Sequence, residues 1–337
     1  METRRDRALG ALLGLAVGDA LGMPTQTMPR SLVESLYGPG GGLDGFRPGP
    51  PQNEISAGLP AGHVTDDTDQ AVIVGELLVE GHGHVDPDRL ADRLLAWQRR
   101  MAAAGSADLL GPSTLRALRL VADGAPVGST GRWGDTNGAA MRVAPVGVAV
   151  PPEPLDRLCD AVADVDRLTH DTTLANAGAC AVAAVVSAGV EGADWADALP
   201  LGLRAASLGA RQGSHVAGAD VARRIGWALD LTRGCSDAVL LDLVDGLVGT
   251  GVATQESVPA AFAVAANAPG DPWRAGLLAA RLGGDSDTVA AMAGAMVGAC
   301  TGASALPPEA VATVRSVNDL DLEPLVDGLL ALRAAAS

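Results

Sequence analysis

Asp66, Asp67 and Asp69 fall within four residues at the start of the apolar stretch "GHVTDDTDQAVIVGELL". A second stretch of similar design, "LGGDSDTVAAMAGAMVGACTG", carries Asp285 and Asp287 near the other end of the chain. A single carboxylate is enough to cap a helix, where it accepts hydrogen bonds from free backbone N–H groups. Both stretches hold more carboxylates than capping needs, and each also has Thr. Oxygen ligands of this kind suit Mg²⁺, Mn²⁺ or Ca²⁺ and not zinc.

Two hypotheses explain these clusters. In the first, each cluster only caps its own helix, with Thr65 or Asp67 as the first cap and Gly284-Asp285 as the second. In the second, consecutive residues at each helix start point several oxygens at one place. Because both clusters lie where a loop becomes a helix, the second hypothesis predicts one shared dinuclear cation site.

The elements that position these clusters are predicted to be helices. Apolar residues recur at spacings of three and four, and the alternation typical of strands is missing. Hydrophobic residues form 48% of the chain and aromatic residues 2%, so the core must consist of Ala, Val and Leu. The segments with the clearest helical period are Arg89–Met101, Leu155–Leu168, Leu174–Val190, Ala217–Leu231, Ser236–Val248 and Trp273–Ala280.

Two Gly- and Pro-rich breaks interrupt this pattern, at Gly38–Gly62 and Asp123–Gly138. Long loops inside a compact domain are usually functional or disordered, and both of these adjoin motif-like segments, which favours function. No change in composition marks a boundary. We therefore expect residues 1–337 to form one all-α domain.

The N-terminal segment "METRRDRALGALLGLAVG" imitates the basic and apolar regions of a signal peptide. However, Gly10, Gly14, Gly18 and Gly22 recur every four residues, which predicts a flat helix face that can approach another backbone closely. We expect a core helix here. We expect no apolar run to reach the ~20 residues that span a bilayer, and therefore no membrane association.

Charge and cysteine content narrow the function further. The 40 acidic residues outnumber 24 basic residues, all of them Arg, and give a net charge of −16. Such a field disfavours binding to a nucleic-acid backbone. The four cysteines contain no CxxC pair, which argues against a disulfide framework or a zinc site and predicts a cytoplasmic location.

Six stretches of the chain resemble the ADP-ribosylglycohydrolase family in sequence and in order. They are "GALLGLAVGDALGMP", "TDDTDQAV", "GDTNGAAMRVAPVG", "THDTTLANAGA", "ESVPAAFAV" and "LGGDSDTVAAMAGAMVGACTG". The resemblance extends from about Ala8 to Gly302. It implies a single compact orthogonal helical domain with a metal cleft at its centre, which would hold two Mg²⁺ or Mn²⁺ ions. The implied metal ligands are Thr65, Asp66, Asp67, Asp285, Asp287 and Thr288, and Asp69 is not among them.

The resemblance also implies a substrate-facing group of residues. His170 matches a family histidine beside the ligand cleft, although a histidine before an Ala-rich helix is otherwise more often a core or capping residue. Asn137 and Gly138 belong to a loop that resembles the family's ribose- and diphosphate-contacting loop. Trp133 could stack on a base or simply pack. Arg142 could pair with phosphate or form a buried structural ion pair.

Two positions bear on the chemistry. Asp108 lies near the place where several relatives carry an acidic residue that helps to position substrate or proton, but it could also cap the helix from Ser113. Gln26 stands at or near a position where many family members carry Glu. Since an amide cannot act as a general base, this departure predicts that Asp108, Glu54 or the ligand aspartates take over any catalytic work of that Glu.

The expected function is therefore metal-dependent hydrolysis of a ribosyl C1″ glycosidic bond in an ADP-ribosylated protein or small ADP-ribosyl compound. Asp66 or Asp67 would orient the nucleophile, and Asp108 is a further catalytic candidate. The Gln26 departure leaves a hydrolase of small ribosides or nucleosides as an alternative. A third hypothesis is a metal-dependent binder of ADP-ribose-like ligands without turnover. The sequence does not predict the leaving group, the choice between Mg²⁺ and Mn²⁺, or the oligomeric state.

Overall fold

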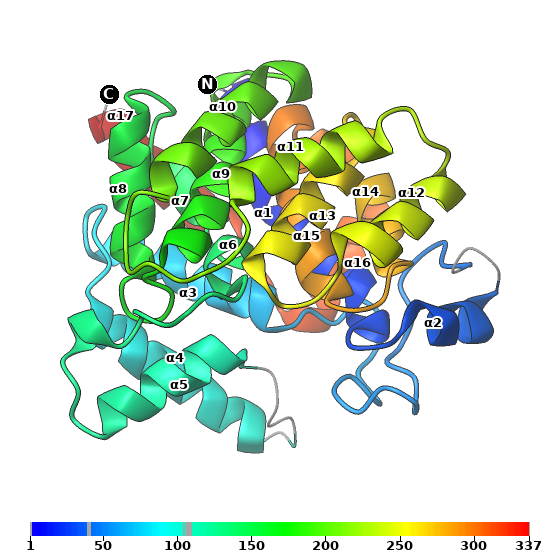
Figure 1. Ribbon diagram of the computed structural model, residues 1–337, viewed down its shortest axis with the longest axis horizontal. Coiled ribbons are helices and arrows are strands. Elements are labelled where there is room, and N and C mark those ends of the chain that lie inside the picture. Colours follow the sequence, from blue (N-terminus) through cyan, green and yellow to red (C-terminus); the bar gives the residue numbers. More distant parts are fainter. Residues whose placement is uncertain (1, 39–41, 104, 106–109, 337) are drawn as a thin grey trace.

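The computed structural model describes residues 2–38, 42–103, 105 and 110–336, and in these ranges the chain is an all-helical domain without strands (Figure 1). In these ranges, Thr136 pairs with Ala253 and Thr172 with Ser214 as isolated β-bridges outside any strand. The elements in the first half of the chain are α1 (Glu2–Gly22), η1 (Met23–Thr25), α2 (Arg30–Tyr37), α3 (Asp66–Glu80), α4 (Pro87–Ala103), α5 (Pro112–Ala122), η3 (Val127–Ser129), α6 (Gly138–Met141), α7 (Ala144–Ala149) and α8 (Leu155–Asp166). The remaining elements are α9 (Thr173–Glu191), α10 (Trp195–Gly209), α11 (Val221–Thr232), α12 (Asp237–Leu243), η4 (Val244–Val248), α13 (Thr254–Asn267), α14 (Pro272–Ala280), α15 (Ser286–Thr301), η5 (Ala303–Ala305), α16 (Pro308–Asn318) and α17 (Glu323–Ala336).

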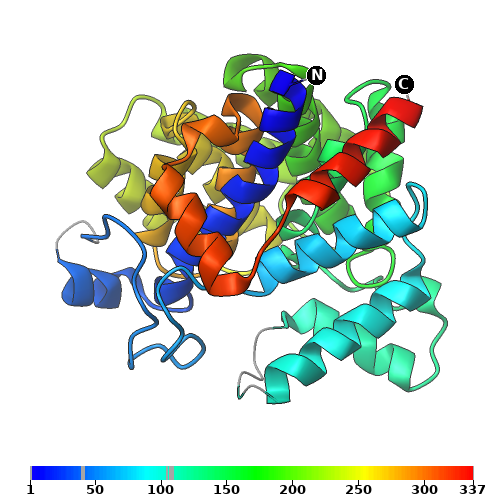
Figure 2. The ribbon, with the colours of Figure 1, turned by 180° about the vertical axis from the view of Figure 1, so that it is seen from behind.

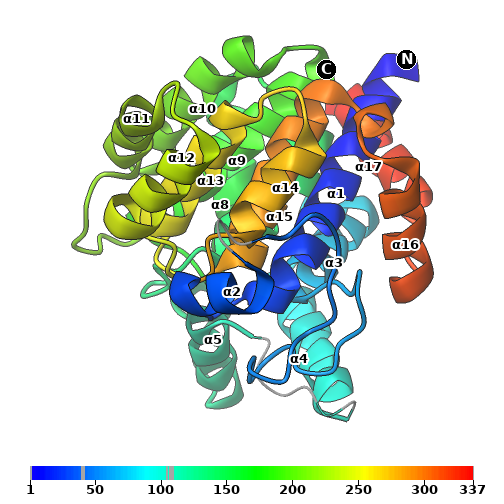
Figure 3. The same ribbon diagram turned by 90° about the vertical axis from the view of Figure 1, so that its right-hand side faces the viewer.

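Helices α1 and α15 lie side by side and approach each other through their glycines (Figure 3). A Cβ atom built on Gly14 would overlap the carbonyl oxygen of Gly294, and one on Gly294 would overlap the carbonyl oxygen of Gly14. The same glycine face of α1 continues to Gly22, where a Cβ atom would overlap the backbone of Asp287. The predicted flat glycine face is therefore confirmed. It places the start of α15, and with it the second acidic motif, against the end of α1.

Helices α1 and α9 form much of the core. By length and composition alone, Thr3–Thr25 and Thr173–Glu191 are each long and apolar enough to cross a membrane, so the expectation that no run reaches spanning length was wrong. In both segments 94% of the apolar window is buried inside the protein. Their many Ala and Gly residues allow close helix packing, and such small residues are also common where helices pack in membranes.

The predicted helical segments match observed helices, with differences at their ends. The segment predicted from Ala217 begins at Val221, because Asp220 caps the helix by accepting a hydrogen bond from the Arg223 backbone N–H at 2.8 Å. The segment predicted through Val248 ends its α-helical part at Leu243 and continues as a π-helical turn.

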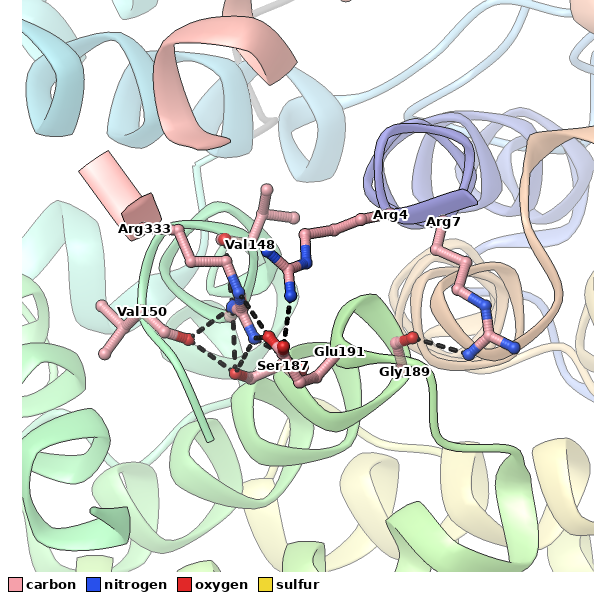
Figure 4. A network of polar contacts seen from close by, with 9 residues as sticks. Arg4, Arg7, Val148, Val150, Ser187, Gly189, Glu191 and Arg333 are labelled. Carbon is pink, nitrogen blue, oxygen red and sulfur yellow. Dashed lines mark hydrogen bonds and ion pairs between the residues drawn. The ribbon is translucent and has the colours of Figure 1, made fainter. Parts of the chain in front are cut away.

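The C-terminal helix is fastened to the core by Arg333 (Figure 4). This side chain is 1% exposed, and its guanidinium donates to the carbonyl oxygens of Val150 at 2.7 Å and Ser187 at 3.0 Å. It also forms an ion pair with Glu191 at 2.9 Å, and Arg4 of α1 reaches the same carboxylate. Charge-assisted bonds of this kind satisfy carbonyls at the ends of α7 and α9. The first and last helices are thus tied to one point on α9.

Helices α4 and α5 stand beside the main helical body at one end of the molecule (Figure 2). Trp97 of α4 donates its indole N–H to Asp69 of α3 at 2.6 Å, and its side chain is buried. Asp69 therefore fastens α4 to α3. This contact gives the third aspartate of the first motif a structural partner, while Asp66 and Asp67 lie at the helix start.

Candidate metal and substrate cleft

Both acidic motifs reach one cleft of about 180 Å³ at the N-terminal ends of α3 and α15. The start of α5, the loop before α6 and the segment after α8 complete its wall. The lining residues are Gln26, Thr27, Ile55, Asp66, Leu110, Gly111, Pro112, Thr114, Thr136, Asn137, Gly138, Met141, His170, Val252, Asp285, Asp287 and Thr288. The cleft thus combines carboxylates, hydroxyls and amides with a partly apolar rim.

Asp19 of α1 holds the first acidic motif in place. Its buried carboxylate accepts hydrogen bonds from the backbone N–H and hydroxyl of Thr65, at 2.9 and 2.8 Å. It also accepts from the backbone N–H and hydroxyl of Thr68, at 3.2 and 2.5 Å. Burial raises the pKa of Asp19 to about 6, although these four donors act in the opposite direction. Asp19 thus accepts hydrogen bonds from backbone N–H groups that have no partner within the first turn of α3.

The first motif begins α3 with Thr65 as its N-cap. The Thr65 hydroxyl oxygen accepts a long hydrogen bond from the Asp67 backbone N–H at 3.4 Å, so of the two predicted caps the structure uses Thr65. Asp66 is half-buried and lines the cleft, whereas Asp67 is 1% exposed and lies beneath it. Neither carboxylate serves as the helix cap.

The second motif is held by backbone contacts on both sides. The Thr27 N–H donates to the Gly284 carbonyl at 2.5 Å, and the Gly284 N–H donates to the Met28 carbonyl at 2.8 Å. The Asp285 N–H donates to the Thr250 carbonyl at 2.7 Å. Gly284 has φ of +62° and its Cα lies against Thr250, so a side chain there would be strained and would overlap its neighbour. Asp285 occupies the N-cap position of α15, but its side chain makes no capping bond.

Direct side-chain contacts join the two motifs and the loop before α6. Thr288 Oγ1 donates to Asp67 Oδ2 at 3.2 Å. Asn137 Nδ2 donates to Asp285 Oδ2 and also to Ser257 Oγ, the latter at 3.0 Å. Asn137 is therefore oriented with its amide nitrogen toward the carboxylate.

The cleft carboxylates disfavour one another's charge. Burial raises the pKa of Asp66 and of Asp287 well above the ordinary value, and the nearby charges of Asp19 and Asp285 raise both further. Burial, followed by repulsion from Asp287, does the same for Asp67. Burial also raises the pKa of Asp285. Such a group is costly to ionise without a compensating cation.

These residues fit a divalent cation chemically. Asp67 Oδ1 and Asp287 Oδ1 are buried and have no hydrogen-bond partner among the described residues, which leaves ligand oxygens free. The remaining predicted ligands, Thr65, Asp66, Asp285 and Thr288, supply only oxygen, as Mg²⁺ and Mn²⁺ prefer. Within the described part of the chain, no three Asp, Glu, His or Cys side chains already stand in position around one ion.

The predicted substrate-facing residues Gln26, Asn137, Gly138 and His170 all line the cleft. The His170 ring lies directly against the Gly138 backbone, since a Cβ on Gly138 would come within 2.7 Å of His170 Cε1. Gln26 is 6% exposed, and its amide nitrogen has no hydrogen-bond partner within the described ranges. That nitrogen is a free donor at the cleft wall.

The other three predicted residues differ in position. Arg142 is fully buried behind the cleft, where it bonds Gln70 at 2.9 Å and Thr169 at 2.5 Å, and it does not line the cleft. Trp133 is 54% exposed, packs against the Arg132 guanidinium at 5.3 Å, and is not a lining residue. Asp108 lies outside the described residues.

Several supporting residues were not predicted. Asp19 is among them, although the "GDALG" stretch of the N-terminal motif carries it. Gln70 follows Asp66 by four residues and therefore lies on the same helix face, a spacing that could have identified it. Thr136 and Thr169 carry no comparable signal, because their roles depend on contacts between distant segments.

Known proteins resemble this chain over nearly its whole length. A family model described as ADP-ribosylglycohydrolase matches residues 1–337. The chain is 37% identical to an uncharacterised Escherichia coli K12 protein, YegU, over 98% of both chains. It is 26% identical to the ADP-ribosyl-[dinitrogen reductase] glycohydrolase of Rhodospirillum rubrum, over 97% of this chain and 96% of that protein. A solved structure of an ADP-ribosylglycohydrolase-related protein complex matches the whole of both chains, with 29% identity and a TM-score of 0.67.

Proposed function

Because this chain belongs to the ADP-ribosylglycohydrolase family and is a glycosidic hydrolase, we propose that it hydrolyses the C1″ bond of ADP-ribosyl conjugates with the help of two Mg²⁺ or Mn²⁺ ions. The observation that carries this proposal is the meeting of both acidic motifs at one cleft, joined by the bond from Thr288 to Asp67 at 3.2 Å. Relatives with named activities act on ADP-ribosyl groups attached to dinitrogen reductase and to arginine.

The proposed metal ligands are Thr65, Asp66, Asp67, Asp285, Asp287 and Thr288. When bound, the ions would supply positive charge beside the ribosyl group and so favour attack by water. The protein's own contribution is positioning. Asp66, half-buried at the cleft wall, is placed to orient a water molecule, and Asn137 fixes the orientation of Asp285. His170 and the backbone of Gly138, which also line the cleft, would contact the substrate.

The size of the cleft supports a second candidate, the hydrolysis of small ribosides. The described residues enclose about 180 Å³, which is less than the ~300 Å³ at the lower end of ordinary ligand pockets. This volume suits a ribosyl group better than a whole ADP-ribose. Gln26, at or near a position where the resemblance implies Glu in many family members, lines the cleft and adds an N–H donor there. The cleft volume and Gln26 therefore bear on which leaving group and nucleotide can bind. The cleavage of the ribosyl bond itself would be the same for both candidate functions.

A turnover assay distinguishes these candidates and tests the proposal. Purified protein is incubated with ADP-ribosyl-arginine, an ADP-ribosyl-serine peptide and simple ribosides, each with Mg²⁺, Mn²⁺ or EDTA. Release of ADP-ribose that requires the cation and is lost in Asp66→Asn supports the proposed function. Release of ribose from simple ribosides alone favours the second candidate. Ligand binding without any release identifies a binder and overturns the proposed hydrolysis.

The cellular location is likewise a proposal. All four cysteines are free in the structure, and a reducing cytoplasm would keep them so. The expected absence of nucleic-acid binding rests on the net charge of −16.

A further inference from the structure

A continuous set of hydrogen bonds, buried along its middle, begins at the cleft carboxylate Asp66. Gln70 lies one turn further along α3, and its amide nitrogen donates to Asp66 Oδ2 at 2.8 Å. The Gln70 amide oxygen accepts from Arg142 Nη1 at 2.9 Å. Because Arg142 can only donate, it fixes which end of the Gln70 amide faces it. The amide nitrogen must then face Asp66.

The same guanidinium leads to the other side of the cleft. Arg142 Nη2 donates to Thr169 Oγ1 at 2.5 Å. Thr169 Oγ1 lies 2.7 Å from His170 Nδ1, and His170 Nε2 lies 3.0 Å from Thr136 Oγ1. Gln70, Arg142, Thr169 and His170 are all fully buried or nearly so. Thr136 lines the cleft.

The donors and acceptors in this set admit one arrangement in which each finds a partner. Thr169 Oγ1 accepts a hydrogen bond from Arg142, and its own hydroxyl hydrogen has no acceptor other than His170 Nδ1 among the described residues. Nδ1 must then carry a lone pair. A neutral imidazole with an unprotonated Nδ1 carries its proton on Nε2. That N–H points toward Thr136 and the cleft.

We propose that Gln70, Arg142 and Thr169 are positioning residues that orient Asp66 and hold His170 as the Nε2–H tautomer, so that the single N–H of His170 is shared between Thr136 Oγ1 and a substrate oxygen in the cleft. The inference rests on the proposed function, since it takes this cleft as the substrate site. It assigns Arg142 a role behind the cleft in place of the phosphate contact predicted from sequence. In this tautomer His170 cannot act as a general base through Nε2, because Nε2 already carries a proton and has no lone pair to accept another.

The surroundings of His170 act in the same direction. Burial lowers the pKa of His170 well below its ordinary value, and the nearby charge of Arg142 lowers it further. A neutral ring with one defined N–H can donate to a ribose hydroxyl or a phosphate oxygen without carrying charge. An N–H donor that is held in place before substrate arrives loses little freedom on binding.

Nitrogen-15 NMR of histidine-labelled protein tests the tautomer without requiring any turnover. The His170 signals are assigned by their loss in His170→Gln. His63, His82, His84 and His215 serve as internal controls of folding. In wild type, Nε2 of His170 is expected to give a protonated signal and Nδ1 an unprotonated one. A protonated Nδ1, or a doubly protonated ring at neutral pH, overturns the proposal whatever the activity assay shows.

Two variants of Thr169 test the source of the tautomer. Thr169→Ser retains the hydroxyl and should keep the wild-type His170 spectrum. Thr169→Val has a similar shape without the hydroxyl, so the signals should move toward a mixture of tautomers, and kcat/KM should fall by about 10-fold for the loss of one oriented hydrogen bond. A wild-type spectrum in Thr169→Val overturns the role of Thr169. If Thr169→Val does not fold, the spectra of wild type and Thr169→Ser still test whether His170 is the Nε2–H tautomer.

Discussion

Thr288 Oγ1 donates a hydrogen bond to Asp67 Oδ2 at 3.2 Å, across 221 residues of chain. This contact joins the start of α15 to the start of α3, and each of these helix starts carries an acidic motif. The two motifs meet because α1 packs against both. Its glycines admit the α15 backbone, and its Asp19 holds Thr65 and Thr68 of the other motif.

Asp287→Asn should have opposite effects in the absence and presence of cation. Without cation, removing one charge relieves repulsion among carboxylates whose pKa values are raised by burial and by one another, so the melting temperature should rise by about 2 °C or more. Wild type should gain about 3 kcal/mol of stability at a cation concentration 100 times the Kd, and the variant should gain much less. Thermal unfolding with EDTA, Mg²⁺ and Mn²⁺ measures both. An equal gain in the two proteins would place the stabilising ion elsewhere.

Gln26→Glu should change which substrates are preferred. A carboxylate at this wall adds negative charge beside Asp66 and Asp285, which disfavours anionic leaving groups. Cation affinity should stay within a few-fold of wild type, because Gln26 is not a proposed ligand. The kcat/KM values for ADP-ribosyl-arginine, ADP-ribosyl-serine peptide and simple ribosides are compared in both proteins. An unchanged ranking would show that Gln26 only packs.

Gly14→Ala should separate α1 from α15. The added methyl group would overlap the Gly294 carbonyl, and backbone on both sides must move, which we expect to cost about 3 kcal/mol. Gly226→Ala on α11 is the matched control, since its methyl group meets no atom within 4 Å. A helical Gly→Ala change without overlap should stabilise by about 1 kcal/mol. Urea unfolding of both variants gives the comparison, and equal stabilities would contradict the close approach.

Asp166→Asn should change how stability depends on pH. Burial raises the pKa of Asp166 to about 8, against the opposing effect of Arg142. Between about pH 4 and pH 8 the folded protein therefore binds a proton that the unfolded chain has lost, so this group's contribution to stability falls as pH rises. The Asn variant has no such proton to lose, and it should gain stability relative to wild type from pH 5 to pH 9. A pH-independent difference in urea unfolding would contradict the raised pKa.

The sequence predicts those parts of the structure that local pattern controls. The glycine spacing of α1, the cap of α3 at Thr65 or Asp67 and the periodic helices can be recognised because their causes lie within a few residues. Helices α10 and α13 were not among the predicted segments, and each contains a proline, Pro200 or Pro259, that interrupts the usual signal. Tertiary packing maintains both helices in spite of the missing N–H.

The position of a side chain relative to the cleft was harder to predict. Arg142 and Asn137 stand five residues apart in one motif, yet Asn137 reaches the cleft and Arg142 is buried behind it. Which way Arg142 points is set by Gln70 on α3 and Thr169 after α8. No spacing within the motif contains that information. The role of Asp19 depends in the same way on the partners that α3 brings to α1.

The most direct test of the account is a crystal soaked in Mn²⁺ and measured at a wavelength where manganese scatters anomalously. The central claim is that the two acidic motifs form one cation site. It predicts anomalous peaks in contact with Asp66 or Asp67 of the first motif and with Asp285 or Asp287 of the second, and their loss in Asp287→Asn. Peaks that contact only one motif, or a cleft without any peak at saturating Mn²⁺, would contradict it.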